Sequence, residues 1–149
     1  MILTSHSPEE TSELAFNLGR LIQPPFVCFL HGELGTGKTL FTQALAKGLG
    51  IKGHINSPTF VFMKIYEGQP RLVHVDAYRL EGVDEPIGIL DELDQDTVMI
   101  IEWPQYLNED IKANMSISLE YIDDQTRILN IDSDHHVMES WRAYVATRD

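Results

Sequence analysis

The sequence predicts a single α/β domain over residues 1–149, with a mostly parallel central sheet, helices on both faces and a C-terminal hairpin. Three observations favour this fold class. Short apolar runs alternate with amphipathic stretches of helical spacing, which is typical of a parallel sheet covered by helices. A length of 149 residues suits one domain with a substantial core. Near the end, residues 116–122 and 127–131 read as two strands around an Asp-Asp turn.

The first third of the chain predicts a helix, a strand and a second helix. Ser7 stands where an N-cap is expected for a helix near residues 8–22, and Glu10 completes a capping box. The apolar run over residues 26–30 suits a buried strand. Apolar residues then recur at helical spacing over residues 40–49, directly before a glycine that can end a helix.

The remainder of the chain predicts further strands and a closing helix. Residues 59–66 and 72–76 are strand-like runs around a Gly-Gln-Pro turn, and residues 98–102 form another core strand. Residues 81–96 are acidic and are expected to be partly helical. A helix over residues 136–148 is expected to close the fold.

The most informative motif lies between the first predicted strand and the second helix. Residues 32–39 read Gly-Glu-Leu-Gly-Thr-Gly-Lys-Thr, which is the GxxxxGK[ST] pattern of a phosphate-binding P-loop. The glycines let backbone N–H groups turn toward phosphate oxygens, and the helix N-terminus adds partial positive charge. Lys38 is placed to reach the β- and γ-phosphates, and the Thr39 hydroxyl is placed to ligate Mg²⁺. The sequence therefore predicts a P-loop NTPase domain that binds a nucleoside triphosphate.

Two predicted strands end in a carboxylate. Asp76 ends the run over residues 72–75, and Glu102 ends the run over residues 98–101. Both side chains are expected at the carboxyl edge of the sheet, where ligands of such sheets bind. A P-loop site needs an acidic residue there to hold Mg²⁺, directly or through water. The spacing leaves open which of the two carboxylates contacts the metal. For each residue, the alternative is that it only caps a strand at the protein surface.

A hydroxyl-bearing segment, Ser57-Pro58-Thr59, follows the second predicted helix. Switch segments of P-loop proteins place a hydroxyl that senses the γ-phosphate at this point of the chain. From the local sequence alone, an ordinary turn before a strand is the better interpretation.

Three other residues allow more than one interpretation, and a fourth, Cys28, allows one. His74 lies in a predicted strand, where a hydrogen-bonded core histidine is the simpler interpretation and a functional histidine is the alternative. Trp103, beside Glu102, either packs under the nucleotide or belongs to a partner surface, and packing is the simpler interpretation. Arg79 either stabilises phosphate charge or pairs with a nearby carboxylate. Cys28, in a predicted core strand, is expected to be inert packing.

The charge balance is strongly acidic. Asp and Glu number 23 against 11 Lys and Arg, giving a formal net charge of −12. Direct nucleic-acid binding draws on a basic surface, so another subunit is expected to hold any nucleic acid. Acidity that only keeps the protein soluble is an equally good interpretation. Because no apolar run approaches the ~18 residues that span a bilayer and no signal peptide is evident, we expect a cytoplasmic protein with no membrane attachment.

Four segments occur in an order that is typical of one family: residues 32–41, Ser-Pro-Thr-Phe at 57–60, His-Val-Asp-Ala-Tyr-Arg-Leu at 74–80 and Ile-Glu-Trp-Pro at 101–104. Together they resemble the TsaE family, also called YjeE, whose members are small bacterial ATPases needed to make threonylcarbamoyladenosine in tRNA. The P-loop alone is generic, whereas the other signatures at these spacings are specific to the family. The resemblance covers nearly the whole chain and weakens beyond Tyr106.

This resemblance implies a role for individual residues. Glu102 resembles the second metal ligand beside Thr39, Asp76 resembles the Walker B-type carboxylate that is important for hydrolysis, and Thr59 matches the switch-like threonine. Thr11 and Arg127 fall near positions that flank the nucleotide in relatives. The residues implied to wrap the ATP phosphates are Glu33, Leu34, Gly35, Thr36, Gly37, Lys38 and Thr39.

The resemblance also implies the cofactors and the partners. The chain would be a Mg²⁺-dependent ATPase that docks on the TsaD–TsaB pair, resets that complex with ATP, and meets tRNA only indirectly. The alternative is a small P-loop kinase that phosphorylates a metabolite. A kinase should carry an arginine-bearing lid, whereas the arginines of this chain do not cluster. A GTPase is disfavoured because the chain has no [NT]KxD guanine motif.

Overall fold

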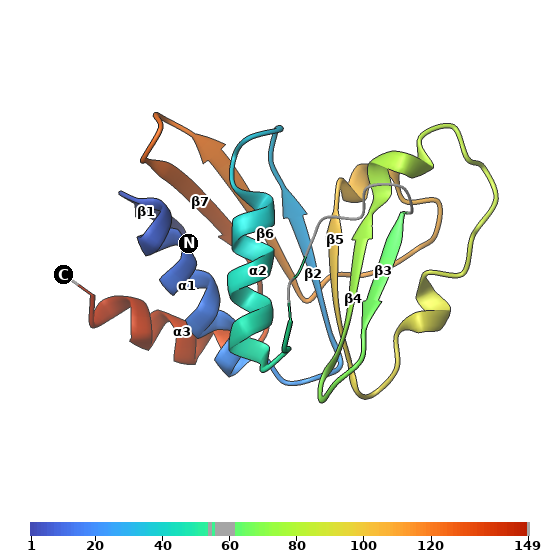
Figure 1. Ribbon diagram of the computed structural model, residues 1–149, viewed down its shortest axis with the longest axis horizontal. Coiled ribbons are helices and arrows are strands. Elements are labelled where there is room, and N and C mark those ends of the chain that lie inside the picture. Colours follow the sequence, from blue (N-terminus) through green and yellow to red (C-terminus); the bar gives the residue numbers. More distant parts are fainter. Residues whose placement is uncertain (54, 56–61, 149) are drawn as a thin grey trace.

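The computed structural model describes residues 1–53, 55 and 62–148, which fold around one seven-stranded sheet (Figure 1). The strands are β1 (Ile2–Ser5), β2 (Phe26–His31), β3 (Met63–Tyr66), β4 (Arg71–Asp76), β5 (Thr97–Glu102), β6 (Met115–Tyr121) and β7 (Arg127–Asp132). The α-helices are α1 (Pro8–Leu21), α2 (Lys38–Leu49) and α3 (Val137–Ala146). Short 3₁₀ helices are η1 (Ala77–Leu80), η2 (Leu90–Glu92) and η3 (Pro104–Tyr106).

The sheet is mixed, with a parallel centre. Its strand order is β1-β7-β6-β2-β5-β4-β3. Strands β6, β2, β5 and β4 run parallel, whereas β1, β7 and β3 pair antiparallel with their neighbours. Strand β5 is buried at all of its positions because parallel strands in the middle of a sheet are covered on both faces. The predicted α/β fold and its β6–β7 hairpin are confirmed.

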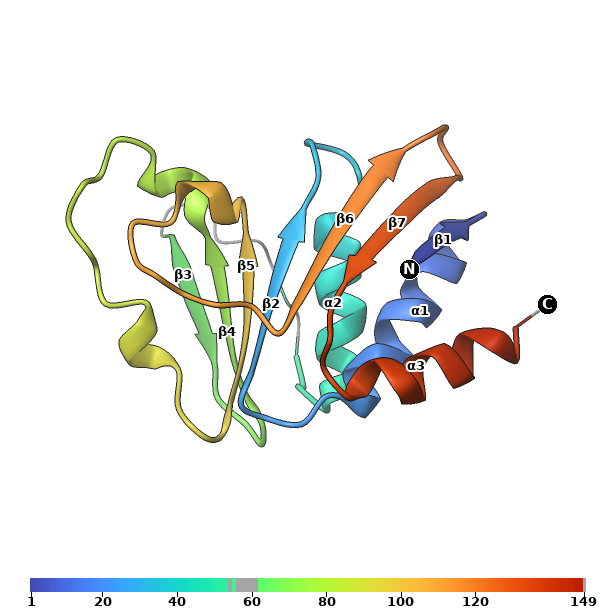
Figure 2. The ribbon, with the colours of Figure 1, turned by 180° about the vertical axis from the view of Figure 1, so that it is seen from behind.

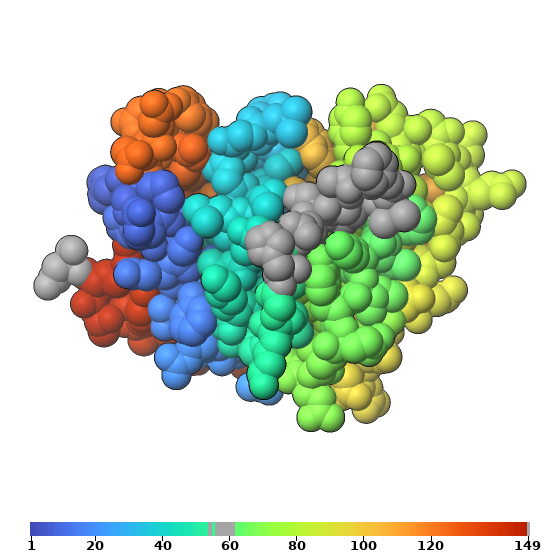
Figure 3. Space-filling view, viewed as in Figure 1, coloured from blue at the N-terminus to red at the C-terminus, as the bar shows by residue number. Residues whose placement is uncertain are grey.

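Each face of the sheet has its own hydrophobic cluster. One cluster joins Leu30, Leu72 and Ile100 of the sheet to the apolar sides of α1, α2 and α3. The opposite cluster joins Met99 and other strand residues to the segment that carries the 3₁₀ helices. Figures 1 and 2 show these coverings from the two sides, and Figure 3 shows α1 and α2 over the first face. Thus α-helices cover one face, and 3₁₀ helices with their loops cover the other.

The two long helices pack unusually closely. A Cβ atom at Gly19 of α1 would overlap the backbone carbonyl of Leu45, and one at Gly48 of α2 would overlap the backbone carbonyl of Phe16. Both glycines are therefore needed where the helix backbones approach each other. Helix α1 begins as predicted, since the Ser7 side chain accepts the backbone N–H of Glu10 at 3.0 Å.

Two elements differ from the sequence-based expectation, and a third lies partly outside the described residues. Strand β1 was not predicted, and it pairs with β7 at the edge of the sheet. The partly helical stretch expected over residues 81–96 is reduced to η2, because Gly82, Pro86 and Gly88 interrupt it. The strand expected over residues 59–66 is described only from Met63, since its first residues lie outside the described part of the chain.

Candidate functional site

The predicted P-loop joins the carboxyl end of β2 to the first residue of α2. Gly35 has a φ of 80° and Gly37 a φ of 103°, in the left-handed region where a side chain would be strained. The loop therefore turns tightly enough to aim the N-terminus of a 12-residue helix, α2, at whatever the loop encloses. In Figure 1 it lies at the upper edge of the sheet, the carboxyl edge of the parallel strands.

Lys38 begins α2 and lies almost wholly inside the site, with 7% of its surface exposed. Its Nζ atom lies 3.7 Å from Oε1 of Glu102 and 4.0 Å from the centre of the Trp103 ring. Burial lowers the pKa of Lys38, although the Glu102 and Asp76 carboxylates act in the opposite direction. Among the described residues, Nζ has no hydrogen-bond partner. The ammonium is thus desolvated and has N–H donors available to bind an anion.

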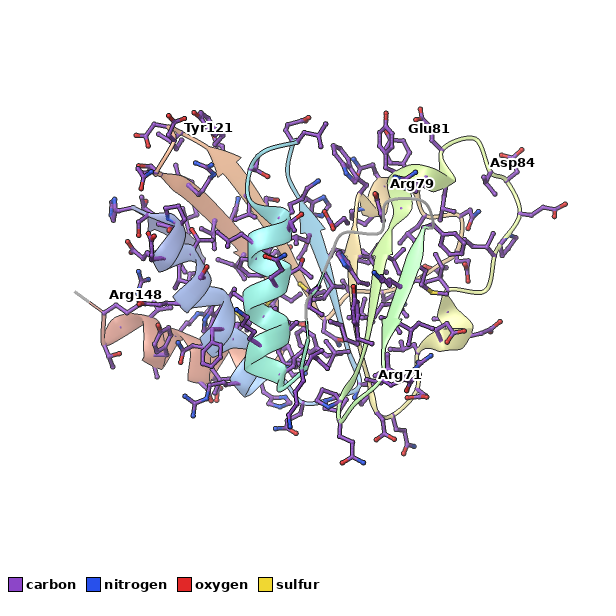
Figure 4. All side chains as sticks on the ribbon, viewed as in Figure 1. Arg71, Arg79, Glu81, Asp84, Tyr121 and Arg148 are labelled. Atoms are coloured by element: carbon purple, nitrogen blue, oxygen red, sulfur yellow. The ribbon has the colours of Figure 1, made fainter. Side chains whose placement is uncertain are left out.

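Asp76 and Glu102 lie side by side at the ends of the parallel strands β4 and β5. Oδ1 of Asp76 accepts the backbone N–H of Tyr78 at 3.2 Å, and Oδ2 lies 3.9 Å from Nε of Arg79. Burial raises the pKa of Asp76, and the nearby Glu102 charge adds to that rise. Arg79 therefore pairs with a carboxylate, one of the two interpretations that the sequence left open, and Figure 4 shows it at the carboxyl edge.

His74 is fully buried in β4, two residues before Asp76. Its Nε2 atom lies 2.6 Å from Oε2 of Glu102. Glu102 consequently contacts two nitrogen-bearing side chains, His74 through one oxygen and Lys38 through the other. These three buried groups form a continuous polar row on the sheet face that α2 covers.

The acidic edge fits a Mg²⁺ ion of the kind that P-loop sites hold. Within the described residues, no group of three His, Cys, Asp or Glu side chains forms a self-contained metal site. Mg²⁺ in nucleotide sites needs less, because it binds through one or two carboxylates, a hydroxyl, water and phosphate oxygens. Asp76 and Glu102 would offer hard oxygen ligands to such an ion, and Thr39 follows Lys38 in the first turn of α2.

Two cavities flank the loop and share a wall. The cavity of about 590 Å³ on the Asp76 side has an aromatic border, in which Tyr78 packs edge-on against Trp103 and Tyr106 at ring distances of 5.4 and 5.2 Å. The second, of about 430 Å³, lies toward β6. The residues common to both are Glu33, Trp103 and Gln105. Room for a ligand therefore exists on both sides of the P-loop.

The site is thus a P-loop at the carboxyl edge of the sheet, with a buried lysine beside a strand-end carboxylate. The family model described as "Threonylcarbamoyl adenosine biosynthesis protein TsaE" matches residues 5–129. The chain belongs to the TsaE family. Membership of this family connects the chain with threonylcarbamoyladenosine biosynthesis in tRNA.

Individual relatives support the TsaE assignment across the chain. The tRNA threonylcarbamoyladenosine biosynthesis protein TsaE of Treponema pallidum is 34% identical over 134 residues, covering 88% of this chain and 99% of that protein. The protein of the same name from Bacillus subtilis is 39% identical over 106 residues, covering 70% of this chain and 67% of that protein. The crystal structure of Bacillus subtilis YdiB superposes with a TM-score of 0.74 at 26% identity, covering 99% of this chain and 94% of that chain.

The remaining residues that the TsaE resemblance singled out differ in how they lie. Arg127 of β7 contacts the P-loop, because its Nε donates to the carbonyl of Thr36 at 2.8 Å. Its guanidinium also lies 4.6 Å from the ring centre of Tyr121. Thr11 is buried at the junction of β1 and α1, where its hydroxyl lies 2.6 Å from that of Ser5, and it lines neither cavity beside the loop. Thr59 lies outside the described residues.

Two features of the site were not anticipated from the sequence. The aromatic border of Tyr78, Trp103 and Tyr106 assembles from η1 and the segment after β5, and nothing in the sequence indicates that these two separate segments meet. Trp103 also has a φ of 55°, which a non-glycine residue rarely adopts. Proline favours an extended backbone in the residue before it, so the Trp-Pro pair gave no signal of this left-handed conformation.

Within the described residues, no helix has the length and apolar character needed to cross a bilayer.

Proposed function

We propose that this chain is a Mg²⁺-dependent ATPase that serves as an accessory subunit in tRNA threonylcarbamoyladenosine modification. It docks on the TsaD–TsaB pair and uses ATP hydrolysis to support the cycling of that complex. The observation that carries the ATP part is the buried Lys38 ammonium, 3.7 Å from Glu102 at the N-terminus of α2. Family membership carries the tRNA-modification part.

The P-loop binds the phosphates of ATP. Backbone N–H groups of residues 33–39 face the phosphate oxygens, and Lys38 moves from Glu102 to the β- and γ-phosphates. Partial desolvation of Lys38 supports this role, because a poorly hydrated ammonium gains more from a phosphate than a solvated one. Glu102 is then released from its contact with the lysine.

Thr39 and Glu102 hold Mg²⁺, and Asp76 acts in hydrolysis. When bound, the metal neutralises charge on the β- and γ-phosphates. Asp76 orients the attacking water and accepts its hydrogen bond, a role supported by a carboxylate whose pKa is raised by burial. Thr59 serves as the switch hydroxyl that senses the γ-phosphate.

Arg127 flanks the nucleotide from the β6–β7 hairpin. Its bond to the carbonyl of Thr36 supports this role, because it ties the hairpin to the loop. Thr11 flanks the nucleotide from α1 in the same proposal, although its described contacts are with Ser5 and Ser7. Of the two, Arg127 is the better supported.

The partners hold the tRNA. A chain with a net charge of −12 repels nucleic-acid phosphates, so contact with tRNA through TsaD and TsaB accords with its composition. The proposal does not require this chain to transfer the threonylcarbamoyl group.

The decisive experiment measures ATP hydrolysis by the purified chain, alone and with TsaD and TsaB, in Mg²⁺ and in EDTA. We expect slow Mg²⁺-dependent release of phosphate that changes when the partner pair is added, and ATP-dependent co-elution with that pair. Partners that neither bind the chain nor alter its turnover contradict the accessory role. Stoichiometric phosphorylation of a small acceptor would instead favour a metabolite kinase.

A further inference from the structure

One fully buried polar side chain, His74, has no part in the roles described so far. Its imidazole has 0% of its surface exposed and lies on the α2 side of β4, the same face as Asp76 and Glu102. Burying an imidazole costs free energy unless its nitrogens are hydrogen-bonded. The hydrogen bond between Nε2 of His74 and Oε2 of Glu102, 2.6 Å long, offsets part of this cost.

The direction of this bond follows from the chemistry of the two groups. An ionised carboxylate can only accept, so Nε2 of His74 carries the hydrogen and donates it to Oε2 of Glu102. In the neutral ring, Nδ1 is then an acceptor, and it has no partner among the described residues. Within the described part of the chain, the ring thus makes one polar contact, and that contact is with Glu102.

His74 and Lys38 divide the two oxygens of Glu102 between them. Oε2 is bound to the imidazole, and Oε1 lies 3.7 Å from Nζ of Lys38 on the P-loop side. A glutamate side chain has three rotatable bonds, so a free carboxylate samples several orientations. The imidazole fixes one oxygen and thereby turns the other toward the loop.

We propose that His74 is a positioning residue that holds Glu102 in the orientation needed to ligate Mg²⁺ at the P-loop. The proposal rests on the function proposed above, because it requires Glu102 to be the metal ligand. Groups that hydrogen-bond to a metal ligand orient it, and their loss commonly weakens metal affinity 10- to 100-fold. His74 is suited to this task because it is fully buried in β4, which is paired on both sides, with β5 and with β3.

Two amide substitutions test the proposal as a matched pair. His74→Gln keeps an N–H donor near the position of Nε2, whereas His74→Asn is one methylene shorter and cannot reach Glu102. Both replacements are neutral and polar, so they differ mainly in reach. Binding of a non-hydrolysable ATP analogue is measured by calorimetry over a series of Mg²⁺ concentrations and in EDTA. Thermal unfolding of each variant confirms that it is folded.

We expect His74→Asn to raise the Mg²⁺ concentration for half-maximal binding about 10- to 100-fold, and His74→Gln to stay within about threefold of the wild type. Affinity in EDTA should be unchanged in both variants, since the imidazole does not contact the P-loop backbone. In a Glu102→Gln background, His74→Asn should have no further effect, because the ligand that it positions is already lost.

The positioning role is overturned if His74→Asn keeps the wild-type Mg²⁺ dependence. It is also overturned if His74→Gln loses as much as His74→Asn, or if affinity in EDTA falls in parallel. These results differ from failure of the proposed function, in which the wild-type chain itself binds no nucleotide or binds it without regard to Mg²⁺.

A measurement on the wild-type chain covers the case in which His74→Asn does not fold. The imidazole N–H proton of His74 is followed by NMR, and it is assigned by its change in Glu102→Gln. With the ATP analogue saturating, we expect this signal to shift when Mg²⁺ is added. A signal that does not respond to Mg²⁺ contradicts the proposal.

Discussion

At the scale of single residues, Lys38 is the group on which the proposed nucleotide affinity most depends. Lys38→Ala removes an ammonium that would make charge-assisted bonds to phosphate, worth about 1.5–3 kcal/mol. We therefore expect nucleotide affinity to fall about 10- to 100-fold, measured by calorimetric titration with ATP and Mg²⁺. Lys47→Ala is the matched control, since Lys47 lies in the same helix but is exposed. If both variants lost the same amount of nucleotide affinity, the effect would come from the change in net charge and not from a contact between Lys38 and phosphate.

Asp76 predicts a pH-dependent effect on stability. Its pKa is raised above the ordinary value of 3.8, chiefly by burial, so the folded state favours the protonated form. Above the folded-state pKa the ionised carboxylate therefore lowers stability, and below pH 3.8 this cost is absent. We expect Asp76→Asn to raise the melting temperature at pH 7, with a gain that shrinks as the pH falls, and to slow ATP hydrolysis.

Asp94 provides a control of opposite sign for Asp76. Hydrogen bonds from Thr97 and from the backbone of Asp96 lower the pKa of Asp94, so its ionised form stabilises the fold at neutral pH. Asp94→Asn should therefore lower the melting temperature at pH 7, and this loss should disappear toward acid pH. If both variants shift the melting temperature in the same direction, the assigned environments are wrong.

The sequence predicted the edge of the sheet at which Lys38, Asp76 and Glu102 lie, but not the contacts among them. The P-loop spacing and the strand-end positions of Asp76 and Glu102 were sufficient to bring Lys38 and two carboxylates to one edge. That His74 reaches Glu102 depends on the register of β4 against β5, and no local pattern encodes that register.

At the scale of elements, the contact between α1 and α2 gives the sharpest prediction. Gly48→Ala improves helix propensity by about 1 kcal/mol, yet its Cβ would overlap the backbone carbonyl of Phe16. Backbone atoms cannot move aside as a flexible side chain does, so we expect a net loss of about 1–3 kcal/mol in the free energy of unfolding. Urea denaturation measures it, with Lys47→Ala as the neighbouring control that should change little. An increase in stability would show that the helices can separate without cost.

The sequence did not predict the elements whose conformation depends on partners distant in the chain. Strands β2, β4 and β5 read as continuous apolar runs because both of their faces are buried. Strand β1 has no such run, and it is a strand because β7 pairs with it from more than a hundred residues away. Similarly, side chains of the segment after η3 hold the loop over residues 81–96, where Glu109 accepts the N–H groups of Ile89 and Leu90.

At the scale of the whole molecule, charge predicts how the chain behaves toward tRNA. With a net charge of −12, the chain alone should not retain tRNA in a gel-shift experiment, even at low salt where electrostatic attraction is strongest. Addition of the TsaD–TsaB pair should bring tRNA and this chain into one complex. Salt-sensitive binding of tRNA by the chain alone would contradict the indirect contact proposed above.

The placement of the two tryptophans gives this protein a built-in pair of optical probes. Trp103 lies in the site with the Lys38 ammonium over its ring, whereas Trp141 is fully buried against α1, where its indole N–H donates to the carbonyl of Leu14. Movement of Lys38 toward a ligand would alter the emission of the first indole, and loss of the core would expose the second. With each replaced in turn by phenylalanine, occupancy of the loop and integrity of the core can be followed separately by intrinsic fluorescence, without any attached dye.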